Sequence, residues 1–353
     1  MTSPRLRTAL GIFTAATVLL ALTGCVESGR GDTSRTVGAA NCPVPVDASV
    51  KGTARIGFQQ IPNGDMIVKD RGWLAACLPN ATINWSNFAS GQDVVQAFAS
   101  GSLDLGTLGS SPATKALSAP LNLPVRVVWI QDVIGKAESL AVRDPAITSL
   151  AGLRGKRIAT PFGSTSHYSL LSALSAAGLT SDVTLINLKP DAILAAWQRK
   201  EIDAAWVWDP SLSTLLADGH VVTSSAEVAA AGAPTFDLSA GRTEFLTANP
   251  KFMLMWTRLQ NFAAAQIAAD PAAAATSIAA QFGTTPEVVR PQLRGYTYPT
   301  AADQAGPAYL GGGFADNLAG TAKFLLQQGG IDAVSPSYSG GIDSTAVRAV
   351  AAQ

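Results

Sequence analysis

The residues with the clearest chemical potential lie in the segment IATPFGSTSHYSLLSAL, residues 158–174, where Ser164, Thr165 and Ser166 directly precede His167. A serine next to a histidine could pair a nucleophile with its base. Neighbouring residues on a helix point in different directions, however, and the chain contains neither a GxSxG elbow nor a GxxxxGKS/T loop. We therefore expect no catalytic residue here and interpret His167 as a wall residue of a cleft or a partly buried donor.

A second turn of similar composition, TLGSSPATKAL, places Gly109, Ser110 and Ser111 before Pro112, a favoured first residue of a helix. Each turn follows an expected strand, so its unpaired backbone N–H groups and its hydroxyls would face a cleft at the strand ends. Neither set of donors has a lysine or arginine beside it, which suits a delocalised monoanion such as a sulfonate better than a phosphate. The other interpretation, that these residues only cap their own helices, stays open.

Three acidic residues are candidates for a carboxylate opposite the anion: Glu138 in GKAESLAV, Asp209 in WVWDPSL and Asp237 in GAPTFDLS. Asp209 directly precedes a proline, so a turn acid is the simpler interpretation there. Trp206 and Trp208 alternate along one expected strand, which would place both on one face of its sheet. They fit a core, although a tryptophan at a strand end could stack on a small cation.

Short β-rich segments alternate with helical segments from residue 53 onward, which predicts mainly parallel sheets covered by helices. The pattern restarts after SLAGLRG. The roughly 300 residues that follow the amino-terminal segment are more than one hydrophobic core usually holds. We therefore predict two doubly wound α/β lobes joined by two crossovers, with the ligand cleft between them. The first lobe is expected at residues 53–140, the second at 141–237, and the return to the first lobe, with C-terminal helices, at 238–353. The expected strands are residues 54–59, 82–88, 103–109, 125–133, 138–144, 156–162, 183–188 and 202–208, and the expected helices between them are 64–78, 91–101, 166–178 and 191–201.

The amino-terminal residues have the pattern of an exported lipoprotein. Two arginines precede an apolar run that ends in the sequence LTGC, which resembles the lipobox of bacterial lipoproteins. That resemblance implies cleavage before Cys25 and lipid attachment to it. Residues 1–24 would then be the signal peptide, and residues 25–52, rich in small and polar residues, a flexible tether. An ordinary signal peptide is the alternative.

Composition limits the partners of the exported chain. The full sequence has 25 basic and 25 acidic residues. Loss of the two signal-peptide arginines leaves the exported chain with a net charge near −2, which argues against nucleic acid as a partner. Besides Cys25, the cysteines are Cys42 and Cys77, a pair that favours a disulfide in an oxidising compartment, although two unpaired thiols are the alternative. Neither has a metal-ligand spacing, so we expect no metal site and no cofactor.

Five segments resemble, in order and spacing, the taurine-binding proteins of ABC importers: GTLGSSP, GKRIATPFGSTSHYSLLSAL, AAWQRKEIDAAWVWDP, GAPTFDL and YTYPTAADQ. The resemblance extends from about Arg55 to Tyr338. It implies a two-lobed periplasmic binding fold of type II and a protein without enzymatic activity. It also implies capture of taurine or a related sulfonate outside the cytoplasm and delivery to a membrane permease with its ATPase. We expect a monomer that is held at the cell membrane by its lipid anchor.

Matched by position, the resemblance implies that Asp237 pairs with an ammonium group and that Trp208 is the tryptophan of the family's VW motif. Two departures, an acid at Asp209 and the small Ser239 in place of a tryptophan, could alter the size or charge preference of the pocket. Other aliphatic sulfonates, nitrate, or an enzyme of the same fold that resembles pyrimidine-precursor synthases therefore stay open. The implied sulfonate ligands are Ser110, Ser111, Ser164, Thr165 and Ser166, and the implied polar lining residues are Gln59 and Glu138.

Overall fold

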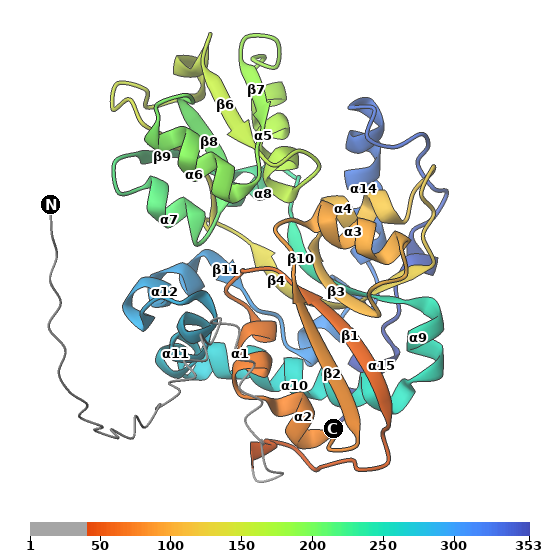
Figure 1. Ribbon diagram of the computed structural model, residues 1–353. Coiled ribbons are helices and arrows are strands. Elements are labelled where there is room, and N and C mark those ends of the chain that lie inside the picture. The colour runs from red at the N-terminus through yellow and green to blue at the C-terminus, as the bar shows by residue number, and fades with distance from the viewer. Residues whose placement is uncertain (1–40) are drawn as a thin grey trace, which may run out of the picture. The chain divides into compact units, whose positions relative to one another are not determined.

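Two β-sheets organise the computed structural model, which describes Asn41–Gln353 (Figure 1). The first sheet has six strands in the order β11-β4-β10-β3-β1-β2. Strand β1 pairs in parallel with β2 and β3, whereas β10 pairs antiparallel with β3 and β4. The strands are β1 (Gly52–Phe58), β2 (Ala81–Asn87), β3 (Leu105–Gly109), β4 (Val125–Ile134), β10 (Phe236–Arg242) and β11 (Tyr296–Thr297).

The second sheet has five strands in the order β7-β6-β8-β5-β9. Strand β6 pairs in parallel with β7 and β8, and β5 pairs antiparallel with β8 and β9. The antiparallel strand β9 was not expected from the sequence. The strands are β5 (Glu138–Val142), β6 (Arg157–Thr160), β7 (Thr184–Asn187), β8 (Ala204–Trp208) and β9 (His220–Ser224).

The chain passes between the two sheets twice, and both passages lie a few residues before the expected positions. All five residues of β5, from Glu138 onward, pair with β8, so the boundary expected after residue 140 would divide one strand. Asp237 lies in β10 of the first sheet rather than in the second lobe. The first passage turns at Gly135, where a Cβ atom would lie 2.7 Å from the carbonyl oxygen of Gly295, so the close approach requires glycine.

Helices surround both sheets, and one expected helix is divided. The pattern over residues 64–78 predicts a single helix, but Gly72, with a left-handed φ of 62°, separates α1 from α2. The helices before β5 or after β10 are α1 (Gly64–Asp70), α2 (Trp73–Cys77), α3 (Gly91–Ala99), α4 (Ser110–Ala116), α9 (Thr243–Ala248), α10 (Pro250–Ala269), α11 (Pro271–Phe282), α12 (Pro286–Gln292), α13 (Ala301–Ala305), α14 (Phe314–Gln327) and α15 (Thr345–Ala351). Those between β5 and β10 are α5 (Thr165–Ala176), α6 (Pro190–Gln198), α7 (Ser211–Leu215) and α8 (Ser225–Ala230).

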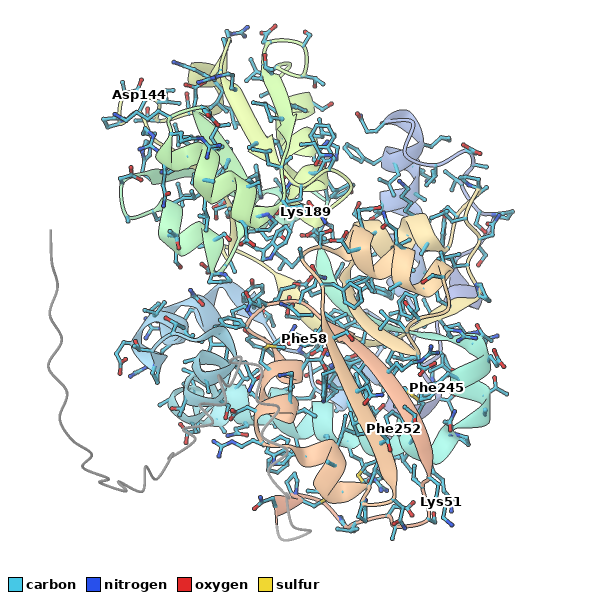
Figure 2. All side chains as sticks on the ribbon, viewed as in Figure 1. Lys51, Phe58, Asp144, Lys189, Phe245 and Phe252 are labelled. Carbon is cyan, nitrogen blue, oxygen red and sulfur yellow. A yellow bond between two sulfur atoms is a disulfide. The ribbon has the colours of Figure 1, made fainter. Side chains whose placement is uncertain are left out.

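Separate hydrophobic cores support the two sheets. In the first, the Phe245 and Phe252 rings pack edge to face, 5.5 Å between centroids, and join α9 to α10 (Figure 2). In the second, Trp206 packs in one cluster with Leu140, whereas Trp208 packs in another with Leu212. The two side chains, two positions apart in β8, thus pack in different clusters, with Trp208 at the end of the strand.

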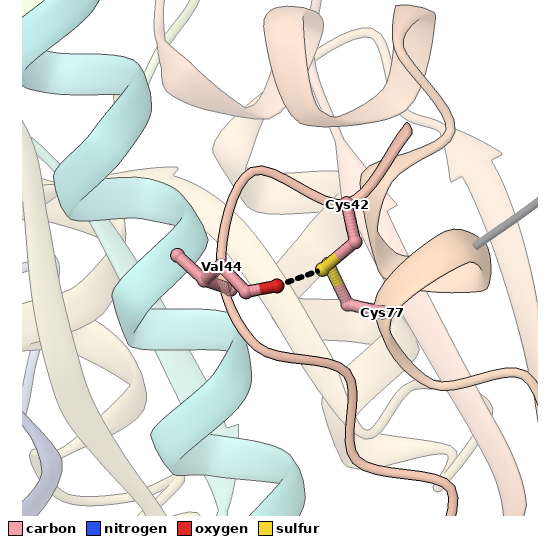
Figure 3. The surroundings of a disulfide bond; sticks show 3 residues. All are labelled: Cys42, Val44 and Cys77. Atoms are coloured by element: carbon pink, nitrogen blue, oxygen red, sulfur yellow. Dashed lines mark hydrogen bonds between the residues drawn. A yellow bond between two sulfur atoms is a disulfide. The ribbon is translucent and has the colours of Figure 1, made fainter. Parts of the chain in front are cut away.

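A disulfide joins Cys42 to Cys77, the last residue of α2 (Figure 3). Their Cα atoms are 5.0 Å apart, and Cys77 is fully buried. The carbonyl oxygen of Val44 lies 2.7 Å from Sγ of Cys42. Because sulfur in a disulfide carries no hydrogen, this is a close contact and not a hydrogen bond. The disulfide therefore attaches the segment before β1 to the first lobe.

Loss of this disulfide should destabilise the protein. It joins residues separated by 35 positions, and a cross-link over such a loop contributes about 3 to 4 kcal/mol by restricting the unfolded chain. We expect the double variant Cys42→Ser, Cys77→Ala to have a free energy of unfolding lower by about that amount in urea denaturation. The reductant-treated double variant is the control, and equal stability of the oxidised protein and the variant would contradict the prediction.

The amino-terminal expectations are only partly within the described chain. The signal peptide, residues 1–24, and Cys25 lie outside it. The expected tether, residues 25–52, is described from Asn41 onward, where Asp47 N donates to Cys77 O at 2.9 Å and Val50 is buried. This part is packed against the folded body, contrary to the expectation of a free tether. Between Asn41 and Gln353, no helix is both long enough and apolar enough to cross a membrane.

Candidate functional site

A cleft lies at the strand ends of the two sheets. Six of the nine candidate ligand-binding residues line it. The other three, Ser110, Ser111 and Ser166, are buried in the first turns of α4 and α5. The residues that line the cleft are Gln59, Ile61, Gly91, Gly109, Pro112, Glu138, Ser164, Thr165, Trp208 and Asp237.

Glycine at position 109 allows the two serine-containing turns to meet. Gly109 is the N-cap of α4, and Thr165 is the first residue of α5. A Cβ atom at position 109 would lie 2.6 Å from Cγ2 of Thr165, so a larger residue would push the turns apart. Gly91, at the start of α3, permits a close approach of α3 to α4, since its Cβ would lie 2.6 Å from Cγ of Pro112. The sequence analysis missed Gly91, although a glycine at a helix start was visible.

Two hydroxyls of the α5 turn already have partners. Ser164 Oγ donates to the carbonyl oxygen of Pro161 at 2.6 Å and accepts the N–H of His167 at 3.1 Å, so it caps its own helix. Thr165 Oγ1 donates to Oε1 of Glu138 at 2.6 Å. A hydroxyl has one hydrogen, and the Ser164 N–H also donates to the carbonyl oxygen of Pro161, at 3.2 Å. An anion at this turn would therefore rely on the backbone N–H groups that follow Ser164.

Two other hydroxyls are buried donors without an established partner. Among the described residues, Ser111 Oγ and Ser166 Oγ have no hydrogen bond of normal geometry. Ser166 lies close enough to Glu138 to lower the pKa of that carboxyl, but it makes no such bond with it. Ser110 Oγ accepts the N–H of Phe236 at 3.3 Å, which leaves its own hydrogen available. Because a buried hydroxyl without a partner is costly, these groups would gain most from a ligand oxygen.

Three carboxyl groups are buried near these hydroxyls. Asp132, at position 8 of β4, pairs in register with Asp237 of β10, and Glu138 begins β5. All three are fully or almost fully buried. Burial and the nearby Asp237 raise the pKa of Glu138 to about 8, and burial raises the pKa of Asp237 to about 7. We call Asp132, Glu138 and Asp237 the acidic cluster. Within the described chain, no lysine or arginine is among the main influences on their pKa values.

Asp132 was missed by the sequence analysis. The signal that could have identified it is the pair Gln131-Asp132 inside the strand VRVVWIQDVI, which is otherwise almost entirely apolar. A charged residue in a buried strand requires a partner or a function. In the described part of the chain, no three His, Cys, Asp or Glu side chains are grouped in a way that could hold a metal ion.

His167 does not act as a base toward Ser166. Its Nδ1 accepts the N–H of Gly163 at 3.2 Å, and its ring stacks on Phe162 with centroids 4.4 Å apart. Burial lowers the pKa of His167 to about 4, so the ring is neutral near pH 7. The residue therefore supports the α5 turn as an acceptor, where the sequence analysis had proposed a wall residue or a donor.

The two departures at Asp209 and Ser239 do not act directly on the cleft. Asp209 accepts hydrogen bonds from the N–H and the hydroxyl of Ser213, at 3.0 and 2.5 Å, as a turn acid does. Ser239 accepts from Nε2 of Gln131 at 3.0 Å and lies 3.2 Å from Oγ1 of Thr107. Neither is among the described residues that line the cleft, because each faces a buried network beside or beneath it.

Gln59 is held in place from the first sheet. Its Nε2 donates to the carbonyl oxygen of Thr107 at 3.0 Å, which leaves its side-chain oxygen as the group that can face the cleft. Trp208 is the aromatic side chain among the described lining residues. The site therefore combines donors on two helix starts, an acidic cluster, one amide and one aromatic wall.

Comparison with known proteins places this chain in a family. Residues 78–281 match the family described as the substrate binding domain of ABC-type glycine betaine transport systems. The chain is 39% identical to the taurine-binding periplasmic protein of Escherichia coli strain K12 over 266 residues, which are 73% of this chain and 82% of that protein. It is similar in structure to the alkanesulfonate-binding protein SsuA from Xanthomonas axonopodis pv. citri bound to MOPS, with a TM-score of 0.66, 25% identity, and 82% and 96% of the two chains covered.

An enzyme shares the fold as well. The desulfurization enzyme DSZB matches with a TM-score of 0.64 over 85% of this chain and 99% of its own, but at 15% identity, which shows the fold alone. These likenesses confirm the expected two-lobed α/β fold of the periplasmic binding type. The identity and coverage of the Escherichia coli relative also confirm the resemblance found in the sequence motifs. This chain belongs to the family of substrate-binding proteins of ABC-type transport systems that includes the taurine-binding periplasmic protein.

Proposed function

We propose that this protein is the extracytoplasmic solute-binding component of an ABC importer and that it captures a small amino-sulfonate, with taurine as the first candidate. The name of the 39% identical relative supports this ligand, and the match to an alkanesulfonate-binding structure supports the sulfonate end. The chemistry of the cleft supports a zwitterion independently. It offers hydrogen-bond donors at one place and unpaired negative charge beside them.

The acidic cluster is the observation that carries the proposal. No lysine or arginine of the described chain is among the main influences on the pKa values of these three buried carboxyl groups. Such a cluster is unfavourable unless its members are protonated or a cation binds beside them. An alkyl ammonium group supplies that cation together with N–H donors. Asp237 lines the cleft and would accept it. Glu138, whose pKa is about 8, is neutral near pH 7 and so does not repel a sulfonate at the adjacent hydroxyls.

Other ligand classes fit these groups less well. Nitrate and unsubstituted alkanesulfonates carry no cation and would leave the Asp237 carboxylate without a partner. Glycine betaine carries a quaternary ammonium without N–H donors, which is usually bound by several aromatic side chains, whereas Trp208 is the aromatic residue among the described lining residues. A primary ammonium and a sulfonate match both ends.

Capture requires the cleft to open and close, and contacts of α3 would change in that motion. Gln92 Nε2 donates to the carbonyl oxygen of Gly163 at 3.1 Å, and Nζ of Lys189 lies 2.9 Å from Oδ1 of Asp93 (Lys189 is labelled in Figure 2). Both contacts join the first lobe to the second across the cleft. Ligand entry would break them, and closure over the ligand would restore them.

The proposal excludes turnover of the ligand. An enzyme of the same fold, as in the pyrimidine-precursor synthase alternative, would need a reactive histidine or another nucleophile in the cleft. His167 is neutral and engaged by Gly163, and Ser164 caps its helix. We therefore infer a binding protein that releases its ligand unchanged to a permease driven by an ATPase.

Attachment to the membrane is part of the same proposal. We infer that Cys25 is lipidated after removal of residues 1–24, because the LTGC sequence resembles a lipobox. The anchor would keep a monomeric binding protein close to its permease.

Removal of the unpaired hydroxyls tests the sulfonate end. We expect Ser111→Ala and Ser166→Ala each to weaken taurine binding by about tenfold in calorimetry, since a hydrogen bond to a charged group contributes about 1.5 to 3 kcal/mol. Neither change should lower the melting temperature of the free protein, because neither hydroxyl has a hydrogen bond of normal geometry within the described structure.

The matched control is Ser118→Ala, at the end of α4. Ser118 Oγ is also buried, but it donates to the carbonyl oxygen of Thr114 at 2.7 Å and lies 2.6 Å from the Tyr338 hydroxyl. This variant should be less stable and should bind taurine normally. Unchanged affinity in both Ser111→Ala and Ser166→Ala would place the sulfonate elsewhere.

A further inference from the structure

Asp132 and Asp237 form a buried pair of carboxyl groups that the proposed ligand contacts only on one side. Their Cα atoms are directly opposed in the antiparallel pairing of β4 and β10, beside a register shift after Asp237. Asp237 lines the cleft and is 4% exposed, whereas Asp132 is 0% exposed and is not among the described lining residues. Of the two carboxyl groups, the one on Asp237 is therefore placed to meet the ligand.

Both carboxylate oxygens of Asp132 lack a hydrogen bond of normal geometry among the described residues, although the backbone N–H of Asp237 lies close enough to lower the pKa of Asp132. Two ionised carboxylates cannot bond to one another, because each can only accept. If one of them carries a proton, the same geometry becomes a carboxyl–carboxylate hydrogen bond, and interaction of this kind between Asp132 and Asp237 lowers the pKa of Asp237. A single proton thus gives Asp132 a hydrogen-bond partner and removes the charge repulsion within the pair.

The surroundings of Asp132 also favour a proton there. The titratable groups that interact with it are Asp237 on β10, Glu138 at the start of β5, Tyr296 on β11 and Tyr298, and the two tyrosines also interact with Asp209. Each of these is an acid, and burial followed by Asp237 and Glu138 raises the pKa of Asp132 well above its usual value. Asp132 is more deeply buried than Asp237, so it is the member of the pair that keeps the proton.

We propose that Asp132 is a positioning residue for the ligand's ammonium group: it carries a proton, donates it in a hydrogen bond to Asp237, and so holds the Asp237 carboxylate charged toward the cleft. The inference rests on the proposed function for the identity of the ligand, but the shared proton does not depend on it. Sequence analysis assigned the ammonium to Asp237 alone. The structure assigns it to a pair in which only one member touches the ligand.

Two variants of Asp132 separate this role from a purely structural one. Asp132→Asn keeps a neutral donor of the same shape toward Asp237, and we expect taurine affinity within about threefold of the natural protein near pH 7. Asp132→Leu keeps the volume but loses the donor, so the pKa of Asp237 rises. Its taurine affinity should fall by about tenfold near pH 7 for each unit of that rise and recover toward about pH 8.5, where an alkyl ammonium is still charged.

Calorimetry of taurine binding between about pH 5.5 and about pH 8.5 measures these profiles. Ethanesulfonate, which has no ammonium group, is the control ligand, and its affinity in Asp132→Leu should not recover at the higher pH. If Asp132→Asn and Asp132→Leu show the same profile, or if Asp132→Leu binds taurine as the natural protein does at every pH, Asp132 does not position Asp237.

Melting of the ligand-free proteins over the same pH range tests the shared proton without any ligand. The natural protein should lose stability as the pH rises, because the folded state holds a proton on Asp132 that the unfolded chain releases. Asp132→Asn should lose stability less steeply, because its amide does not titrate and only Asp237 and Glu138 still do. Equal slopes for the two proteins would overturn the inference even if taurine binds. If stability depends on pH as expected in the two proteins but taurine does not bind, the shared proton of the carboxyl pair is supported and the proposed ligand is rejected.

Discussion

Replacement of Asp237 by alanine is expected to weaken taurine binding by at least about 100-fold, since removal of one partner from a buried ion pair costs about 3 kcal/mol or more. The affinity for ethanesulfonate should change much less, because that ligand has the sulfonate but not the ammonium group. Asp237 lines the cleft and, with a pKa of about 7, is available as a carboxylate to a cationic ligand. Calorimetry with both ligands measures the difference.

Asp209→Ala is the matched control for this experiment. Asp209 is also an almost fully buried aspartate near the site, but its carboxylate accepts hydrogen bonds from Ser213 and it is not among the described lining residues. The variant should be less stable, while its preference for taurine over ethanesulfonate should persist. Equal weakening of the two ligands by Asp237→Ala would show that Asp237 is not the partner of the ammonium group.

The ligand-free protein should lose stability as the pH rises from about 6.5 to about 8.5, by about 2 kcal/mol or more. Asp237 and Glu138 have folded-state pKa values of about 7 and about 8, above their unfolded values. The folded state therefore binds more protons than the unfolded state in this window, and the free energy of unfolding decreases with pH. Below about pH 6.5, His167, whose folded pKa of about 4 is depressed, acts in the opposite direction and partly cancels the effect.

Scanning calorimetry at several pH values, with and without saturating taurine, measures this dependence. Bound ammonium stabilises the ionised carboxylates, so taurine should reduce the decrease. The double variant Asp237→Asn, Glu138→Gln removes two of the three titrating carboxyl groups, so its stability should decrease less steeply, with Asp132 accounting for the remaining slope. A natural protein whose melting temperature stays constant or rises across this window would contradict the assignment of raised pKa values to the acidic cluster.

Much of the fold could be predicted from the sequence because its signals are local. The strands around Ile56, Leu108 and Ala159 combine apolar side chains with nearby glycines or prolines, and each expected strand is present within a few residues. The helix over residues 64–78 was predicted as one element because a single glycine, Gly72, does not show from the sequence whether it adopts a left-handed conformation. Strand β9 was missed because its pairing with β5 is a long-range contact.

The site could be predicted only in part, for a related reason. The serine-containing turns and Asp237 stand out by residue type, and they do meet at the cleft. That Thr165 donates to Glu138, or that Asp132 opposes Asp237, depends on the register of strands far apart in the chain. Residue types at a helix start indicate donors, but they do not indicate which donors already have partners.

The most direct test of the proposed function is calorimetry of the purified, ligand-free protein with taurine, ethanesulfonate and glycine betaine. The two-ended site predicts one taurine per protein, bound at least about tenfold more tightly than ethanesulfonate, because only taurine can join the sulfonate donors and the Asp237 carboxylate. Glycine betaine, with neither a sulfonate nor N–H donors, should bind more weakly still. Tighter binding of glycine betaine than of taurine, or no measurable binding of taurine, would contradict the account.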